Sequence, residues 1–232
     1  MADPKSFFLG AEIHEYLVAH GTPPDAVQQG LISRTAELGG VSMMQIAPEQ
    51  GAFMTMLTRL LDVRSAVEVG TFTGYSALCI ARGLAPGGRL LCCDVSEEWT
   101  SVGQAAWEQA GVSDRIDLRI APAIETLRAL PAERTIDLAF IDADKPMYGA
   151  YADEILSRMR PGGLLMVDNV LWGGAIVDAT ANDENTVALR AFNDWLIADE
   201  RVETVMLPLG DGLTLARRVE PLGVGQNFPV RP

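Results

Sequence analysis

The sequence predicts an α/β protein: a doubly wound sheet of seven strands with helices on both faces and a helical extension at the N-terminus. From residue 63 onward, short apolar runs alternate with longer segments of helical periodicity, which is typical of parallel sheets built from strand–helix–strand units. The last two runs are separated only by the glycine-rich segment 208–212, which favours an antiparallel hairpin at the end of an otherwise parallel sheet.

The expected elements follow in order along the chain. In the extension, residues 1–62, apolar residues recur at helical spacing, Pro23-Pro24-Asp25 begins a second helix that Gly39-Gly40 ends, and a third helix covers 50–61. We expect strands over 66–69, 89–93, 115–120, 136–141, 164–167, 202–207 and 213–218, and helices over 75–83, 97–110, 123–130, 148–159 and 185–198. We treat residues 1–232 as one domain, with the α/β core over 63–232.

Charge and composition narrow the class of partner. The sequence contains 18 Lys plus Arg residues and 31 Asp plus Glu residues, so its formal net charge is −13. This negative charge disfavours nucleic acid and anionic membranes as partners. A solubilising acidic surface explains the charge equally well. Cys79, Cys92 and Cys93 lie in apolar contexts without metal-ligand spacing, as core residues do in a reducing compartment. Because the sequence shows neither a signal peptide nor a membrane-spanning run, we expect a cytoplasmic protein.

Oxygen-bearing side chains follow two of the expected strands. Asp142 comes directly after 136–141, and Asp168-Asn169 come directly after 164–167. If these strands are parallel neighbours, the three side chains converge at one edge of the sheet, where ligands of such sheets bind. Carboxylate and amide oxygens suit Mg²⁺, Mn²⁺ or Ca²⁺ rather than zinc. Helix capping is the alternative role for these residue types.

A glycine turn, residues 68–74, follows the first expected strand. Gly70 and Gly74 let the backbone approach a ligand, but their spacing does not match a dinucleotide fingerprint. Asp94 ends the next strand, where its carboxylate can bind both hydroxyls of a ribose. Asp94 and Glu68 together would repel a pyrophosphate, whereas S-adenosylmethionine is cationic at sulfur, so the sequence favours that ligand. The alternative is a tight turn in which Asp94 caps a helix.

Three segments together resemble a known family: Glu68-Val-Gly-Thr-Phe-Thr-Gly-Tyr-Ser76, Phe140-Ile-Asp-Ala-Asp-Lys-Pro-Met-Tyr148 and Gly162-Gly-Leu-Leu-Met-Val-Asp-Asn-Val-Leu-Trp172. From about Val41 to the end, the chain resembles the cation-dependent class I O-methyltransferases, which include caffeoyl-CoA O-methyltransferase and, more distantly, catechol O-methyltransferase. The resemblance implies a Rossmann-like sheet. It also implies a set of residues that hold S-adenosylmethionine: Ile46 (through its backbone), Glu68, Gly70, Thr71, Ser76, Asp94, Ala123 and, in support, Asp144. Several plant relatives have a hydroxylic residue where Ile46 stands, so no polar side-chain role is expected there. The implied metal ligands are Asp142, Asp168 and Asn169.

The expected reaction is methyl transfer from a sulfonium to a phenol, whose pKa of about 10 leaves it protonated near neutral pH. A cation bound by both oxygens of a vicinal diol would lower that pKa and fix the attacking oxygen. Lys145 would accept the proton as general base, and Asp142 would act through the cation, which makes these two the expected catalytic residues. The alternative for Lys145 is a salt bridge with Asp142 or Asp144.

Several other residues have two possible roles. Tyr148 and Trp172 would either flank an aromatic acceptor or belong to the core and lid, and Met43 and Met44 would either line the acceptor pocket or pack. His14 and His20, the two histidines, are expected to be structural or surface residues rather than ligands.

The sequence therefore predicts a Mg²⁺-dependent O-methyltransferase acting on a small catechol-like aromatic. Methylation of another diol-bearing metabolite stays open. A nucleotide-binding oxidoreductase would instead be stabilised by NAD, and an inactive binding module would bind S-adenosylmethionine without transferring its methyl group. The apolar residues Phe7, Phe8 and Leu17 suggest burial against a second subunit, so we expect a homodimer.

Overall fold

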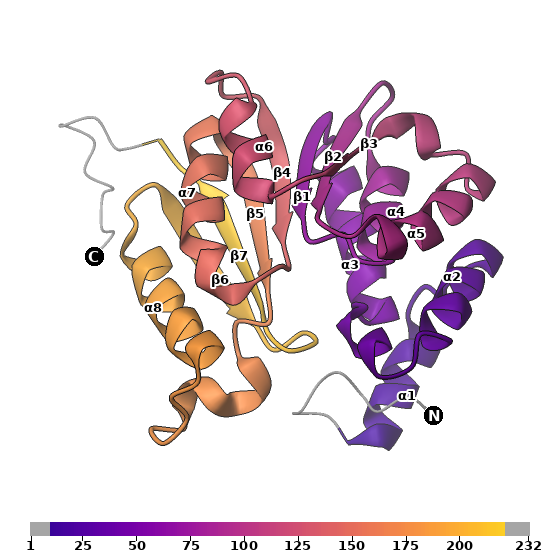
Figure 1. Cartoon of the computed structure of the whole chain (residues 1–232), viewed down its shortest axis with the longest axis horizontal. Coiled ribbons are helices and arrows are strands. Elements are labelled where there is room, and N and C mark those ends of the chain that lie inside the picture. The colour runs from indigo at the N-terminus through magenta and orange to yellow at the C-terminus, as the bar shows by residue number, and fades with distance from the viewer. Residues whose placement is uncertain (1–9, 221–232) are drawn as a thin grey trace, which may run out of the picture.

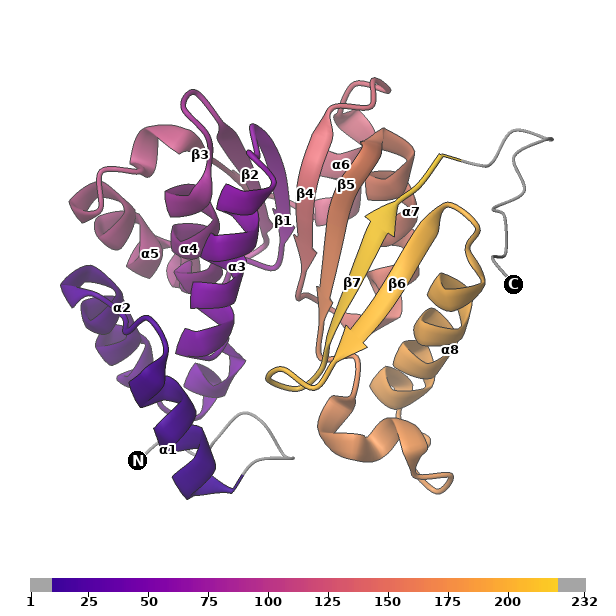
Figure 2. The same cartoon turned by 180° about the vertical axis from the view of Figure 1, so that it is seen from behind.

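Seven strands form one sheet in the order β3-β2-β1-β4-β5-β7-β6 in the computed structural model, which describes residues 10–220 (Figures 1 and 2). The strands are β1 (Ser65–Val69), β2 (Arg89–Asp94), β3 (Ile116–Ile120), β4 (Ile136–Ile141), β5 (Met159–Asp168), β6 (Val202–Leu207) and β7 (Leu213–Arg218). β1 to β5 pair in parallel, whereas β7 runs antiparallel to both β5 and β6. The predicted sheet and its antiparallel end are confirmed, while Phe7 and Phe8 lie outside the described residues.

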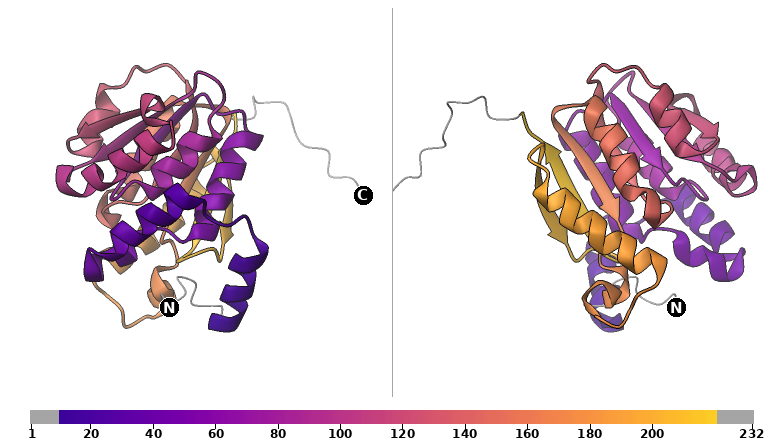
Figure 3. Two further views of the ribbon diagram at one scale, coloured as in Figure 1. Left: turned by 90° about the vertical axis from the view of Figure 1, so that its right-hand side faces the viewer. Right: turned by 60° about the vertical axis from the view of Figure 1, so that its left-hand side comes forward.

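Helices cover both faces of this sheet. They are α1 (Ala11–His20), α2 (Ala26–Ala36), α3 (Pro48–Leu60), α4 (Tyr75–Gly83), α5 (Glu97–Gln109), α6 (Ala123–Ala129), α7 (Tyr148–Arg158) and α8 (Glu184–Ala198). α3, α4 and α5 lie on one face, and α6, α7 and α8 lie on the other (Figures 1 and 2). In the turned views of Figure 3, α1 lies at the margin of the molecule, and none of its residues is buried.

Side-chain caps explain where several helices begin. Asp25 caps α2 in a capping box with Gln28, Ser96 caps α5 and Asp183 caps α8. α3 begins at Pro48, since proline lacks the N–H that a first helical position would leave unpaired.

Successive core side chains along a strand pack on opposite faces of the sheet. On β4, Leu138 and Phe140 pack toward α3 and α4, whereas Ala139 and Ile141 pack toward α7. The three cysteines are buried and free, as predicted for core residues. Within residues 10–220, no helix is long and apolar enough to cross a membrane.

Three local expectations were wrong. β5 begins at Met159 instead of residue 164, because Met159 pairs with Ile136 before the register shifts toward Leu138. Helix α2 ends at Ala36, and Gly39 opens a separate 3-10 turn, η1 (Gly39–Met44). The expected loop after β5 contains a 3-10 segment, η4 (Trp172–Val177), kinked by two glycines with positive φ. A short 3-10 turn, η3 (Lys145–Met147), also leads into α7, and another, η2 (Ser113–Arg115), precedes β3.

Candidate active site

The carboxyl ends of β4 and β5 meet at the edge of the sheet where η4 and α1 also lie, toward the bottom of Figures 1 and 2. Ile141 pairs with Val167, so Asp142 and Asp168 follow in parallel on neighbouring strands. The Lys145 ammonium lies 2.6 Å from Asn169 Oδ1 and 3.3 Å from Asp142 Oδ1. The structure therefore brings both predicted strand ends within reach of one cationic group.

Asp168 is the most enclosed member of this group, with 3% of its surface exposed. Its Oδ1 accepts a hydrogen bond from the Asn169 backbone N–H at 2.7 Å, and its Oδ2 accepts one from Gln50 Nε2 at 2.7 Å. Burial, followed by the nearby charge of Asp142, raises the pKa of Asp168 above its ordinary value. A cation beside these two carboxylates would relieve both effects.

Lys145 is held from three sides. Besides Asp142 and Asn169, its ammonium donates to the Tyr148 hydroxyl at 2.8 Å, and that hydroxyl donates to the Asp168 carbonyl oxygen at 3.2 Å. Tyr148 is fully buried, so it is a core residue that supports the lysine. The Trp172 ring lies 5.6 Å from Lys145 Nζ, within range of a cation–π contact. The alternative salt bridge between Lys145 and Asp142 is present in this structure.

Backbone strain is concentrated around this edge of the sheet. Asn169 and Trp172 have φ values of 59° and 46°, and Phe72 in the glycine turn has a φ of 49°. Side chains rarely adopt this left-handed conformation, and such residues cluster at functional sites. At Asn169 the strained backbone accompanies a side chain whose amide oxygen reaches Lys145.

The glycine turn joins β1 to α4 beside the same edge. Gly70 has a φ of 89°, and a Cβ on it would lie 2.1 Å from the carbonyl oxygen of Asp142. Gly74, with a φ of 78°, precedes α4, and a Cβ there would lie 2.5 Å from the Trp107 ring. Both positions therefore require glycine for conformation and for space. Gly74 is the N-cap of α4 and makes no side-chain cap, so within the described part of the chain the first N–H groups of the helix have no capping partner, as at anion sites on helix N-termini.

Asp94 braces the glycine turn from the end of β2. Its Oδ2 accepts from the backbone N–H groups of Thr71 and Phe72 at 2.9 and 2.8 Å, and its Oδ1 accepts from Ser96 N–H at 2.8 Å. Ser96, not Asp94, caps α5, so the alternative that Asp94 is the helix cap was wrong.

Glu68 lies beneath the turn and is fully buried. Burial raises its pKa to about 7. Its Oε2 accepts a weak hydrogen bond from Cys92 Sγ. Within residues 10–220, the buried Glu68 Oε1 and Thr71 Oγ1 have no hydrogen-bond partner, which leaves two polar atoms for a ligand at the turn.

The remaining predicted residues surround the same edge from other elements. Ile46 is buried just before α3, and Ala123 is the buried first residue of α6. Asp144 accepts a hydrogen bond from the Tyr151 hydroxyl at 2.7 Å, which fixes its orientation after β4. His14 pairs with Glu49 on α3, in agreement with a structural role.

Two residues at this edge were not predicted as site residues. Gln50, on α3, donates to Asp168 across 118 positions of sequence. Asp211, in the β6–β7 hairpin, accepts from Gly173 N–H at 2.6 Å, and burial raises the pKa of its carboxyl. In the sequence, Gln50 is marked only by its place at the start of the third expected helix, and Asp211 only by its place in the glycine-rich segment 208–212.

The side chains at this edge of the sheet have the donor chemistry of a divalent-cation site. Residues 10–220 contain no group of three or more His, Cys, Asp or Glu side chains that could hold a metal. Asp142, Asp168 and Asn169 supply two carboxylates and an amide, a hard oxygen set that suits Mg²⁺ or Mn²⁺. Because an ammonium group already lies between Asn169 and Asp142, the location accommodates positive charge. These residues fit a cation.

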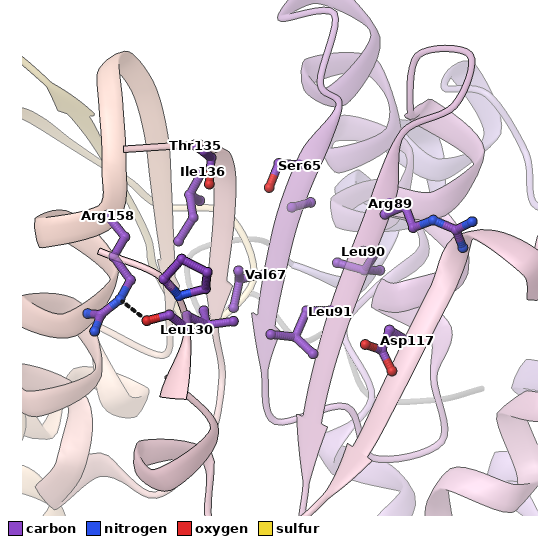
Figure 4. A pocket seen from close by; sticks show the side chains of 12 residues that line it. Ser65, Val67, Arg89, Leu90, Leu91, Asp117, Leu130, Thr135, Ile136 and Arg158 are labelled. Atoms are coloured by element: carbon purple, nitrogen blue, oxygen red, sulfur yellow. Dashed lines mark hydrogen bonds between the residues drawn. The ribbon is translucent and has the colours of Figure 1, made fainter. Parts of the chain in front are cut away.

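A separate hollow lies at the opposite end of the sheet (Figure 4). Ser65, Arg89 and Ile136, the first residues of their strands, line it, and Arg158 bonds to the Leu130 carbonyl at its margin. Since Asp142 and Asp168 follow the other ends of the strands, this hollow is not part of the candidate site.

Comparison with known proteins identifies the family of the chain. The profile of a family described as O-methyltransferase matches residues 22–219. Catechol O-methyltransferase domain-containing protein 1 of Mus musculus is 40% identical over 183 residues, 78% of this chain and 69% of that protein. Caffeoyl-CoA O-methyltransferase 2 of Zea mays is 38% identical over 189 residues, 77% of this chain and 72% of that protein. An O-methyltransferase from Bacillus cereus, solved in complex with SAH (S-adenosylhomocysteine), superposes with a TM-score of 0.81 at 30% identity, covering 89% of this chain and 97% of that one.

Proposed function

Because the chain belongs to the O-methyltransferase family and is an S-adenosylmethionine-dependent enzyme of the caffeoyl-CoA O-methyltransferase type, we propose that it methylates a small catechol-like aromatic with the help of a divalent cation. One observation carries the proposal. The Lys145 ammonium contacts Asp142 and Asn169, with the buried Asp168 beside them. The proposed general base therefore lies next to the proposed oxygen ligands of the cation. This arrangement suits removal of a proton from a hydroxyl group bound between them.

The cofactor is proposed to occupy the glycine turn. Glu68 Oε1 and Thr71 Oγ1 are buried without partners there, so each is available to a polar ligand. Asp94 Oδ2 accepts from two backbone N–H groups of the turn, and the same carboxylate is proposed to bind the ribose hydroxyls. The remaining proposed cofactor contacts are Ile46, Gly70, Ser76, Ala123 and Asp144.

Asp142, Asp168 and Asn169 would hold the cation, which would supply Lewis-acid activation of a hydroxyl of the acceptor. Lys145 Nζ, after losing one proton of its ammonium to solvent, would accept the proton of that hydroxyl as a neutral amine, and Tyr148, which already bonds to Nζ, would keep it in place. The methyl group then passes from the sulfonium to the phenolate oxygen as the carbon–sulfur bond breaks. The Trp172 ring would cover one side of the acceptor.

A methyl-transfer screen tests this function. Purified protein is incubated with S-adenosylmethionine and catechols, caffeoyl esters or flavonoids, with Mg²⁺ or with EDTA, and each acceptor is matched by its mono-methoxy analogue. We expect turnover only with a vicinal diol and Mg²⁺, and restoration when Mg²⁺ is added after EDTA. Equal turnover in EDTA would refute the role of the cation, and equal methylation of the analogues would refute the catechol acceptor.

A homodimer is proposed on the exposed apolar residues of α1. Ile13 and Tyr16 are 60% and 66% exposed, and α1 buries none of its residues against the rest of the chain. Light scattering should give about twice the 25.0 kDa chain mass, and a monomer at working concentration would refute the dimer. A cytoplasmic location is proposed on the three free, buried thiols.

A further inference from the structure

We infer that Gln50 is a positioning residue for Asp168, fixing that carboxylate for the cation from a helix of the N-terminal extension. The inference rests on the proposed function, because it assigns Asp168 to the cation. It concerns a side chain that is not among the proposed ligands and that acts through Asp168.

The contact is direct and enclosed. Gln50 Nε2 donates to Asp168 Oδ2 at 2.7 Å, and Gln50 and Asp168 are 1% and 3% exposed. With Asn169 N–H on Oδ1, a donor engages each carboxylate oxygen. An ionised carboxylate offers about four lone-pair positions, so both oxygens keep a position for a cation.

Gln50 has little freedom to move. The next residue, Gly51, brings α3 so close to α4 that a Cβ on it would lie 2.7 Å from Cys79 Sγ and from the Tyr75 ring. This packing fixes the first turn of α3 against α4, and therefore the position from which the Gln50 side chain extends. At its far end, a Cβ on Gly210 would lie 2.6 Å from Gln50 Oε1. The amide is thus confined between the β6–β7 hairpin and Asp168.

The arrangement matches the support that metal ligands receive elsewhere. Ligating carboxylates are themselves hydrogen-bonded, and loss of such a partner typically lowers metal affinity by about 10- to 100-fold. Without Gln50, Asp168 Oδ2 would be buried with no donor, and the carboxylate would be held only through the Asn169 N–H on Oδ1. The cation would then have to order the side chain when it binds.

Gln28 provides a matched control. Like Gln50, it is a glutamine of the N-terminal helices whose Nε2 donates to a buried side chain, in this case Cys79 Sγ at 3.4 Å. Cys79 lies within α4 and is not among the proposed ligands, so loss of the Gln28 amide should not affect the cation.

The test measures Mn²⁺ binding to the full chain by electron paramagnetic resonance, without cofactor or acceptor. It compares wild type with Gln50→Met, which keeps length but removes the donor, Gln50→Asn, which shortens the reach, and Gln28→Met. S-adenosylhomocysteine affinity by calorimetry and the melting temperature are measured on each. We expect Mn²⁺ to bind at least about tenfold more weakly to both Gln50 variants and unchanged to Gln28→Met. S-adenosylhomocysteine should bind with wild-type affinity throughout.

Three results would overturn the inference. If both Gln50 variants bind Mn²⁺ as wild type does, Gln50 does not position Asp168. If Mn²⁺ and S-adenosylhomocysteine affinities fall together, Gln50 supports the packing of α3 in general. If wild type itself binds no Mn²⁺, the cation of the proposed function is refuted together with the inference. Because the first result leaves Mn²⁺ binding to wild type intact, the failure of the inference alone can be distinguished from the failure of both.

Discussion

The Lys145 ammonium lies 2.6 Å from the Asn169 side-chain oxygen, a contact between the 3-10 turn after β4 and the strained residue after β5. Lys145 is 8% exposed, so this contact forms with little competition from water. The proposed base and a proposed metal ligand are therefore adjacent in the structure itself. A substitution at Lys145 can be expected to act on proton transfer and on the cation in different directions.

Replacement of Lys145 by methionine should lower kcat by about 10²- to 10⁴-fold, the contribution typical of a general base. Mn²⁺ affinity should not fall, because the substitution removes a positive charge from beside Asp142 and Asn169. Steady-state kinetics and Mn²⁺ titration of the same protein check both parts. Wild-type kcat would remove Lys145 from the mechanism, and a loss of Mn²⁺ binding would make its role that of holding the ligands.

The cation should also be visible at Lys145 without any turnover. Lys5 and Lys145 are the two lysines of the sequence, so ε-¹³C-lysine labelling gives two side-chain signals. Mg²⁺ should shift the Lys145 signal in wild type and leave it unshifted in Asp168→Ala. The Lys5 signal serves as the internal control.

Asp94 combines a charge with support of the glycine turn, and two substitutions separate these roles. Asp94→Ala removes the acceptor of the Thr71 and Phe72 N–H groups, whereas Asp94→Asn keeps an oxygen for them but loses the charge. If the carboxylate binds ribose, both variants should bind S-adenosylhomocysteine more weakly, with a loss of about 1.5–3 kcal/mol per charged hydrogen bond, roughly 10- to 100-fold. Calorimetry checks this. Wild-type affinity in Asp94→Asn would restrict Asp94 to bracing the turn.

Glu68 should make the fold less stable as pH rises. Its folded-state pKa of about 7 lies above the ordinary value of 4.5, so the native state holds a proton that the unfolded chain has already released. Stability contributed by the neutral form is complete below pH 4.5 and is lost as pH rises toward 7, about 3 kcal/mol over this window. Urea unfolding of wild type and Glu68→Gln across pH 4.5–7.5 isolates this slope, because the glutamine cannot ionise. Parallel stability curves would mean that Glu68 is charged in the native state.

The fold was largely predictable because its strands are short apolar runs separated by turns. The bounds of β4, β6 and β7 agree with the prediction. β5 was predicted too short, since Pro161-Gly162-Gly163 reads as a turn although Met159 before it already pairs with Ile136.

The candidate site was predictable only where its residues end strands. Asp142, Asp168 and Asn169 have fixed offsets from apolar runs, so their approach follows from sheet topology. The contact of Gln50 with Asp168 depends instead on how closely α3 packs on α4, which no local pattern encodes. The same holds for Asp211, whose hairpin reaches the Gly173 backbone only in the folded chain.

The near-contact of Gly70 with the Asp142 carbonyl has a consequence for how such proteins diversify. The proposed nucleoside-binding groups Glu68, Thr71 and Asp94 lie on or next to β1 and β2, and the proposed metal ligands Asp142, Asp168 and Asn169 lie at the ends of β4 and β5. At position 70, between these two halves of the sheet, only glycine fits, because a Cβ would collide with the Asp142 carbonyl oxygen. If the proposed sites are divided in this way, recombination that exchanges one half among relatives would change the acceptor and retain the methyl donor, provided that the glycine between the halves is inherited.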